Sequence, residues 1–165
     1  MKIKLNEGAI FSSNNITDSG YDVCCLGYRD VNDCKLNEPE MLKEGEYITL
    51  FPHETVMILT GVYMELPEPK DCGDYMEIME AQVRPRSGLS LKESKVAILG
   101  TVDNSYRGEI GVILNNTSDE QVSIQYKEKI AQIVLVPIRK YKNIEIVSEL
   151  SETTRGANGF GSSGK

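Results

Sequence analysis

The chain has 165 residues, of which 40% are hydrophobic and 26% are charged, and its formal net charge is −7. A chain of this length can bury one core without a disulfide or a structural metal, so we expect a single folded unit. No apolar run approaches the roughly 18 residues that a membrane span needs, and the first residues lack a signal-peptide core, which favours the cytoplasm. Proteins that coat phosphate backbones are usually basic, so the acidic balance argues against nucleic-acid binding.

The four cysteines are Cys24, Cys25, Cys34 and Cys72, and the chain has one histidine, His53. The cysteines form no C-x-x-C pair, and adjacent cysteines are poor partners for each other. We therefore expect free thiols in a reducing compartment and no zinc site. No residue pattern around the histidine indicates a Ser-His-Asp arrangement.

Short segments with alternating apolar residues recur along the chain and are separated by turn residues. They predict strands over residues 2–5, 21–26, 47–51, 55–59, 75–83, 109–114, 122–126 and 130–137. One short stretch, residues 89–95, looks helical. This pattern predicts an all-β sandwich, barrel or jelly roll. The apolar periodicity ends near residue 150, so we expect a β domain over residues 1–150 and a flexible glycine-rich arm over residues 151–165.

Residues 85–90, Pro-Arg-Ser-Gly-Leu-Ser, follow a predicted strand and open the helix-like stretch. Arg86 offers a planar fork, Ser87 a hydroxyl and Gly88 an open backbone, which together suit an anion at the start of a helix. The same residues also suit a plain turn in which the serine caps a helix. The hexapeptide alone leaves both interpretations open.

Residues 100–109 read as a hairpin, with a glycine near each end and Asp-Asn-Ser in the turn. A turn aspartate is usually only an Asx turn. Asp103, however, follows an apolar residue at the end of a strand, where a half-buried carboxylate can hold and deprotonate a water molecule. Tyr106, three residues later, can lie against a sugar.

The last eleven residues contain four glycines together with Arg155 and Phe160. The glycines allow the backbone to approach a ligand closely, the arginine suits phosphate oxygens, and the aromatic ring suits a base. A disordered glycine-serine tail is the alternative interpretation. Two sparser motifs, residues 18–22 and 127–132, would not attract notice alone.

Taken in order, the motifs at residues 18–22, 85–90, 100–109, 127–132 and 155–164 resemble the five motifs of the trimeric deoxyuridine triphosphatases (dUTPases). The resemblance implies a distorted jelly roll of the β-clip, dUTPase-like type that forms a homotrimer. It implies Mg²⁺-dependent hydrolysis of dUTP to dUMP and pyrophosphate, which lowers dUTP and supplies the dTTP precursor. In the family, the arm of one subunit closes over a pocket that the other two build.

The resemblance also assigns roles to single residues. Asp103 looks like the general base that activates water for attack on the α-phosphorus, and Tyr106 like the ring that packs under the deoxyribose. The substrate-binding residues that it implies are Arg86, Ser87, Gly88, Gly100, Val102, Tyr106, Gly111, Gln132, Arg155, Phe160, Gly161 and Ser162. Magnesium would ride on the triphosphate without a direct protein ligand, with Asp22 in its outer shell.

The chain departs from the family pattern at a few positions. Lys127 and Lys129 stand where the family usually has Gly and Arg, and Asn158 stands where it usually has Gly. Ala97 occupies a position that is often Asn in bacterial members, so base recognition should depend on backbone groups. None of these changes removes a catalytic group.

Two alternatives stay open beside dUTP hydrolysis. A dCTP deaminase-like enzyme would need a glutamate on the strand after residue 109, but residues 111–114 are apolar throughout. A dUTPase-fold regulatory binding module is the other alternative. Residues 26–40 and 68–79 look like insertions that form surface loops, and such loops can also hold a protein partner.

Overall fold

The structure is a computed structural model, and it describes residues 1–30 and 38–158. These residues form thirteen strands and one helix, which confirms the expected all-β class. The strands are β1 (Lys2–Leu5), β2 (Tyr21–Cys24), β3 (Gly27–Asp30), β4 (Glu40–Met41), β5 (Tyr47–Leu50), β6 (Thr55–Glu65), β7 (Lys70–Asp71), β8 (Tyr75–Pro85), β9 (Lys95–Ala97), β10 (Gly100–Val102), β11 (Glu109–Asn116), β12 (Val122–Gln125) and β13 (Lys129–Tyr141), and the helix is α1 (Ser87–Glu93).

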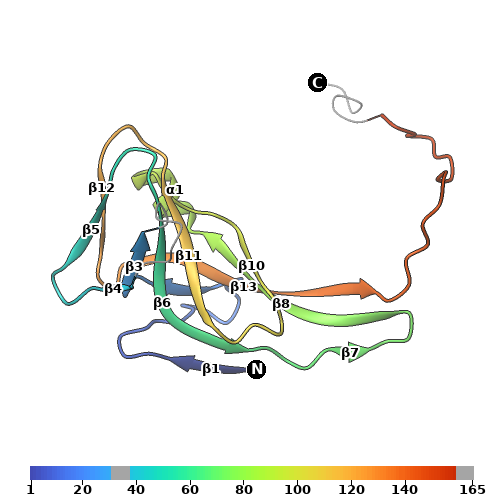
Figure 1. Cartoon of the computed structure of the whole chain (residues 1–165), viewed down its shortest axis with the longest axis horizontal. Helices are drawn as coiled ribbons and strands as arrows, with labels where there is room; N and C mark the ends of the chain where they lie inside the picture. Colours follow the sequence, from blue (N-terminus) through green and yellow to red (C-terminus); the bar gives the residue numbers. More distant parts are fainter. Residues whose placement is uncertain (31–37, 159–165) are drawn as a thin grey trace.

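The strands form three antiparallel sheets in a jelly-roll-like arrangement (Figure 1). The largest has the order β4-β3-β6-β11-β9, with β1 also paired to β6. The second has the order β10-β8-β13-β2, with β7 paired to β8, and the third consists of β12 and β5. Apart from the consecutive pairs β3–β4 and β7–β8, neighbouring strands in these sheets are distant in sequence, so long-range pairing builds the fold.

All three sheets contribute side chains to one hydrophobic core. Ile58 and Val112 come from the largest sheet, Val23 and Ile133 from the second, and Ile124 from the third, and all five are fully buried. Burying an aliphatic side chain of this size contributes about 1.5–3 kcal/mol to stability. The core therefore fixes β2, β8 and β13 beside one another, and these strands carry three of the predicted motifs.

Several predicted boundaries were wrong because local patterns do not reveal pairing partners. Strand β6 continues six residues past the predicted end, through a bend at Gly61, whose φ is 68°. The hydroxyl of Thr60 donates to the carbonyl of Ile110 at 2.6 Å and holds the bend against β11. The helix begins at Ser87 and ends at Glu93, two residues earlier at each end than predicted.

The expected hairpin over residues 100–109 is also wrong. Strand β10 pairs with β8 in the second sheet, whereas β11 pairs with β6 and β9 in the first. The chain therefore changes sheet at the turn between β10 and β11, as strands do at the corners of a sandwich.

The two stretches read as surface loops contain regular structure. Strand β3 lies inside the largest sheet, between β4 and β6. The start of β8 pairs with β7 and with the end of β13. Residues 31–37, which include Cys34, lie outside the described residues.

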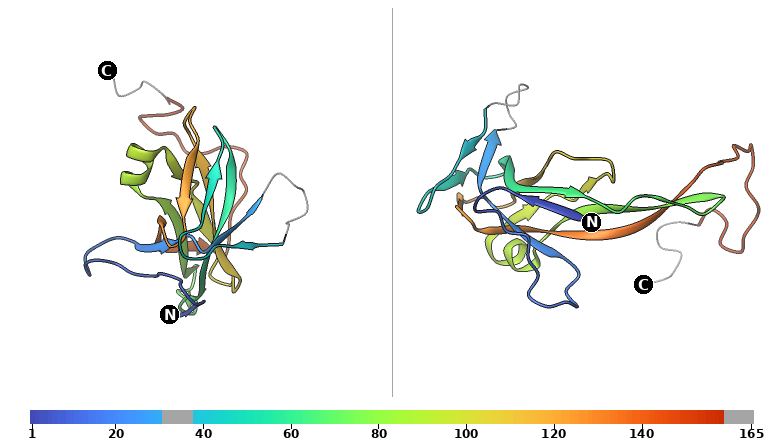
Figure 2. Two further views of the ribbon diagram at one scale, coloured as in Figure 1. Left: turned by 90° about the vertical axis from the view of Figure 1, so that its left-hand side faces the viewer. Right: turned by 90° about the horizontal axis from the view of Figure 1, so that it is seen from below.

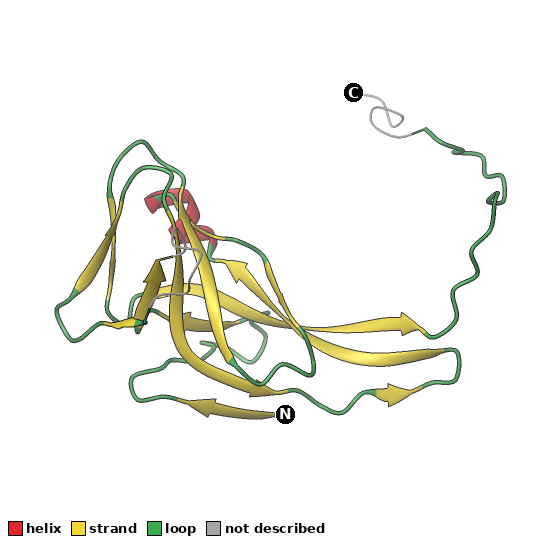
Figure 3. Cartoon of the chain, viewed as in Figure 1, coloured by secondary structure: helices red, strands yellow, loops and turns green. Residues whose placement is uncertain are grey.

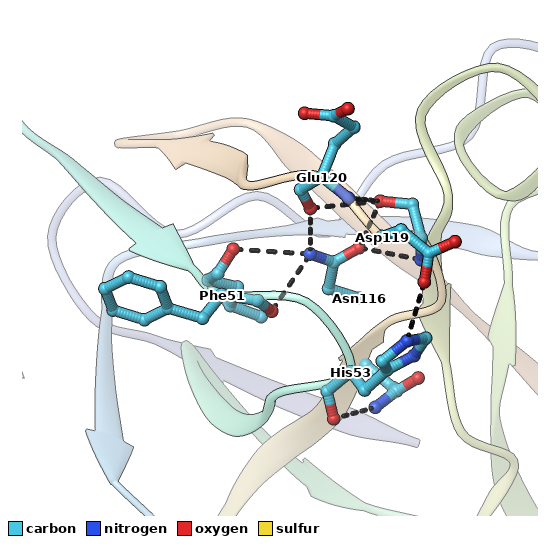
Figure 4. Close-up of polar contacts among 8 residues, drawn as sticks. Phe51, His53, Asn116, Asp119 and Glu120 are labelled. Carbon is cyan, nitrogen blue, oxygen red and sulfur yellow. Dashed lines mark hydrogen bonds and ion pairs between the residues drawn. The ribbon is translucent and has the colours of Figure 1, made fainter.

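Buried Asn116 joins two connections at one end of the molecule (Figure 4). Its Nδ2 donates to the carbonyls of Leu50, Phe51 and Glu120 at 2.7 to 3.3 Å. On the same face, His53 lies 3.0 Å from an Asp119 carboxylate oxygen, with most of both side chains exposed. His53 therefore belongs to a surface contact between two turns, in keeping with the lack of any catalytic pattern around it.

Strands β8 and β13 form a long two-stranded ribbon that projects beyond the rest of the molecule (Figures 1 and 2). The segment after β13, drawn as loop in Figure 3, leaves the end of this ribbon, and residues 142–158 are exposed throughout. Within the described residues, no helix has the length and apolar character needed to cross a membrane.

Burial protects two of the free thiols. It raises the pKa of Cys25 to about 12, and it also raises the pKa of Cys24, whereas Cys72 is partly exposed. Only the thiolate is nucleophilic, so roughly 10⁻⁴ of the Cys25 thiols are reactive at pH 8. We expect iodoacetamide at pH 8 to alkylate Cys72 in the native protein, and Cys24 and Cys25 only in denaturant, as read by peptide mass mapping. Equal labelling of all three in the native protein would contradict this packing.

Candidate active site

A carboxylate held between two cations lies where β2, β8 and β13 meet. The Oδ1 of Asp22 is 3.1 Å from the Nε of Arg86, and its Oδ2 is 2.9 Å from the Nζ of Lys129. The Nη1 of Arg86 also donates to the carbonyl of Lys129 at 2.8 Å. Asp22 is 19% exposed at its side chain, and the two cations are each about one-third exposed. This triad fixes the arginine fork at the end of β8.

The Arg-Ser-Gly motif opens helix α1 beside this triad. Arg86 is the extended residue before the helix, and no side chain caps the first turn. Ser87 therefore does not play the capping role of the plain alternative, and the first N–H groups of a helix have no intrahelical acceptor. A hollow of about 380 Å³ lies in front of the motif, and nothing lies within 4 Å of the position that a Cβ of Gly88 would occupy.

Gln132 lines the same hollow from β13, together with Asp22 and Arg86. Its Nε2 donates to the carbonyl of Pro85 at 3.1 Å, which orients the amide beside the motif. A Cβ on Gly20 would lie 2.5 Å from the Oε1 of Gln132, so this position needs glycine for the amide to take its place. The structure thus brings four residues from three motifs into one polar cluster: Asp22, Arg86, Lys129 and Gln132. The neutral amide and the two cations of this cluster suit phosphate oxygens.

A second hollow, of about 570 Å³, lies between β10 and β11. Gly100, Val102, Tyr106 and Gly111 all line it, with apolar side chains such as Ile113 beneath. Strand β10 is an edge strand that pairs only with β8, so its other side has no strand partner, which suits recognition of a planar base edge. The hydroxyl of Tyr106 donates to the carbonyl of Glu109 at 3.0 Å, which fixes its ring at the edge of the hollow.

Asp103 lies in the turn that follows β10. Its carbonyl accepts the N–H of Tyr106 at 3.0 Å, and the neighbouring Asn104 donates to the carbonyls of Pro67 and Met79, which anchors the turn. The expected half-buried position is wrong for the single chain, because the Asp103 side chain is exposed. A carboxylate on an anchored turn is rigidly placed, and only a second surface could desolvate it.

The two hollows share no lining residue, and Asp103 lines neither. Arg155 lies on the exposed segment after β13, where its Nε donates to the carbonyl of Asn158 at 3.0 Å. None of the described arm residues, 151–158, lines either hollow. In Figure 1 the described part of the arm leads away from the end of the β8–β13 ribbon. Phe160, Gly161 and Ser162 lie outside the described residues.

The comparisons with known proteins agree with this geometry. The dUTPase family model matches residues 42–164. The chain belongs to the dUTPase family. A deoxyuridine 5'-triphosphate nucleotidohydrolase from Clostridium novyi is 49% identical over 122 residues, which cover 72% of this chain and 78% of that protein. A protein of the same name from Hydrogenobaculum is 47% identical over 122 residues, which cover 72% and 77% of the two chains.

Among solved structures, a G164S mutant of the Staphylococcus bacteriophage 80alpha dUTPase with dUpNHpp has a TM-score of 0.73 at 26% identity. The similarity covers 99% of this chain and 98% of that chain. It confirms the dUTPase-like β fold over nearly the whole length.

The fourth motif shows how this dUTPase accommodates its departures from the family pattern. Lys127 has a φ of 62°, in the left-handed region that favours glycine, at the position where the family usually has glycine. Lys129 stands where the family usually has arginine, and its ammonium reaches Asp22. The motif interpretation named Lys129 only as a departure, although Lys129 directly precedes the predicted strand over residues 130–137 that carries Gln132, which was a signal of proximity to the cluster.

We expect Asp22→Asn to destabilise the protein by about 1–2 kcal/mol, because the two partly buried cations lose their shared anion. The measurement is the free energy of unfolding in urea. Asp71→Asn is the matched control, since Asp71 pairs with Lys142 at 2.6 Å on an exposed part of the ribbon and should show no measurable change. Equal losses in both variants would contradict a structural role for the triad.

Proposed function

We propose that this protein hydrolyses dUTP to dUMP and pyrophosphate. The observation that carries the proposal is the pair of hollows, one between β10 and β11 with Gly100, Tyr106 and Gly111 and one with Arg86, Ser87, Gly88 and Gln132. The first suits a base and a deoxyribose, and the second suits a triphosphate. The curated relatives are named for this activity.

In the proposed reaction, Asp103 accepts a proton from water as the water oxygen forms a bond to the α-phosphorus. The bond from that phosphorus to the bridging α–β oxygen breaks, and pyrophosphate leaves with the electron pair. Arg86 and the N–H groups at the start of α1 stabilise the charge on the phosphate oxygens. Tyr106 packs under the deoxyribose, where a 2′-hydroxyl would collide with the ring.

We propose Mg²⁺ as the cofactor, bound by the triphosphate. Among residues 1–30 and 38–158, no group of three or more His, Cys, Asp or Glu side chains is arranged to hold a metal ion. Asp22 is engaged by two cations, which fits an outer-shell role only. Bound Mg²⁺ would neutralise phosphate charge. A phage phi11 dUTPase structure, 23% identical, is described as showing the coordination of a structural Mg(II) ion.

We propose a homotrimer in which each active site uses three subunits, with residues 1–150 as the β domain and residues 151–165 as the arm. The separation of the two hollows within one chain and the exposed Asp103 support shared sites. Ile144, Ile146 and Leu150 are each more than 80% exposed after β13, which is costly unless another subunit covers them. The arm would then place Arg155 on the γ-phosphate, Phe160 over uracil, and Gly161 and Ser162 on the phosphates.

We also propose a cytoplasmic location, because the described cysteines are free. A dCTP deaminase-like activity is disfavoured by residues 111–114 of β11, which are apolar and in which Val112 and Leu114 are fully buried. The carboxylate of Glu109, at the start of this strand, accepts the N–H of Gly61 at 2.7 Å and so has a structural role. A protein partner at the inserted segments stays a prediction. Pyrophosphate release from dUTP, compared with ammonia release from dCTP, separates the two enzymes, and absence of both favours a binding module.

We expect Asp103→Asn to lower the turnover of dUTP by roughly 10²–10⁴-fold, the usual contribution of a general base. Binding of dUpNHpp, measured by calorimetry, should stay near the wild-type value because the fold and the hollows are unchanged. Asp119→Asn, on another exposed turn, is the control and should turn over normally. Near wild-type turnover by Asp103→Asn would show that another group acts as the base.

We expect two inactive chains to complement each other if the sites are shared. An Asp103→Asn chain mixed with a chain truncated after Leu150 should recover activity, because mixed trimers contain sites with an intact base from one chain and an intact arm from the other. Each parent alone is the control, and affinity tags report subunit exchange. An inactive mixture with demonstrated exchange would count against shared sites.

A further inference from the structure

Lys95 is the one buried charged side chain among the described residues. It opens β9, and its Nζ lies 2.8 Å from the Oε2 of Glu93 and 2.7 Å from the Oε1 of Glu128. Burial alone would lower the pKa of Lys95, but the two carboxylates outweigh burial and raise it. A buried ammonium is costly unless it is paired, so these two contacts determine where the lysine can lie.

The two carboxylates belong to segments that carry the phosphate-binding residues. Glu93 is the last residue of α1, the helix that follows Arg86 directly. Glu128 lies in the turn between β12 and β13, immediately before Lys129. Its Oε2 accepts the N–H of Gln125 at 2.9 Å, and its carbonyl accepts the N–H of Cys25 at 2.9 Å, so the turn is fixed around this side chain.

Helix α1 needs such a tie because it is short. A helix of seven residues is not stable alone, and its position depends on tertiary contacts. Leu89 is its buried anchor, and the Lys95–Glu93 pair holds its far end. Glu93 also lines the hollow in front of the motif, where an unpaired carboxylate would repel phosphate.

We infer that Lys95 is a positioning residue for triphosphate binding, which ties the end of α1 to the β12–β13 turn and neutralises Glu93 beside the hollow. Lys95 does not line the hollow itself, so it acts through Glu93, Arg86 and Lys129. The ligand in this inference rests on the proposed function. The hollow between β10 and β11 shares no residue with this network, so base recognition should be independent of Lys95.

The test compares affinities for dUpNHpp and deoxyuridine in the full-length protein, by calorimetry and NMR titration. The ratio of the two dissociation constants measures the contribution of the phosphates. We expect Lys95→Met to lower the affinity for dUpNHpp by roughly tenfold to a hundredfold, since a misplacement of about 1 Å can cost on the order of 10²-fold, and to leave deoxyuridine binding unchanged. Lys142→Met, which removes an exposed ion pair on the ribbon, is the control and should change neither.

Glu128→Gln provides a second variant that should fold even if Lys95→Met does not, because the amide oxygen can still accept the N–H of Gln125. Glu128→Gln should also weaken the binding of dUpNHpp more than that of deoxyuridine. The double variant should lose no more affinity for dUpNHpp than the more affected single variant, because both changes break the Lys95–Glu128 pair. Equal losses of affinity for both ligands, or an unchanged ratio, would overturn the positioning role. A wild-type protein that binds deoxyuridine and dUpNHpp equally would instead overturn the proposed function.

Discussion

The shared anion of Asp22 is the constraint on which the hollow in front of α1 depends. One carboxylate, placed by β2, pairs with Arg86 from the end of β8 and with Lys129 from the start of β13. Without this carboxylate, the positive charges of Arg86 and Lys129 would repel each other in a partly buried space. The single carboxylate neutralises only one of its two cations, so the triad keeps one positive charge, and its donors are already oriented by the ion pairs.

Orientation matters here because the protein is acidic. With a formal net charge of −7, the surface as a whole does not attract a polyanionic nucleotide by long-range steering. Under the proposed function, binding comes from short-range contacts with the fork of Arg86, the amide of Gln132 and backbone N–H groups, and from the Mg²⁺ proposed to accompany the nucleotide. Such contacts would discriminate by geometry, which suits an enzyme that must distinguish one nucleotide from its close relatives.

The sequence predicted the parts of this site that are local and missed those that depend on distant pairing. Residues 85–90 predicted a turn that opens a short helix, and the structure has this turn without a side-chain cap. The turn residues after position 102 predicted the turn that follows β10. The contact between Asp22 and Lys129 joins residues 107 positions apart, and no local pattern predicts it. The hairpin interpretation failed for the same reason, because β10 and β11 flank one turn but find partners in different sheets. Lys95 was the last residue of the predicted helical stretch, and no local pattern marked it as buried.

The sequence motifs and the single chain differ in one respect, because the residues of the five motifs do not all meet within one chain. Either some motif residues have lost their role, or other subunits complete the site. The first explanation would leave the motif residues free to vary in conformation, yet Gln132, Tyr106 and the Asp103 turn are each held by specific hydrogen bonds. The second explanation, the proposed homotrimer, accounts for two separate hollows, for an exposed carboxylate on an anchored turn, and for the exposed side chains of Ile144, Ile146 and Leu150 after β13. If the site is divided among subunits, activity is conditional on assembly, and an isolated chain does not hydrolyse nucleotides.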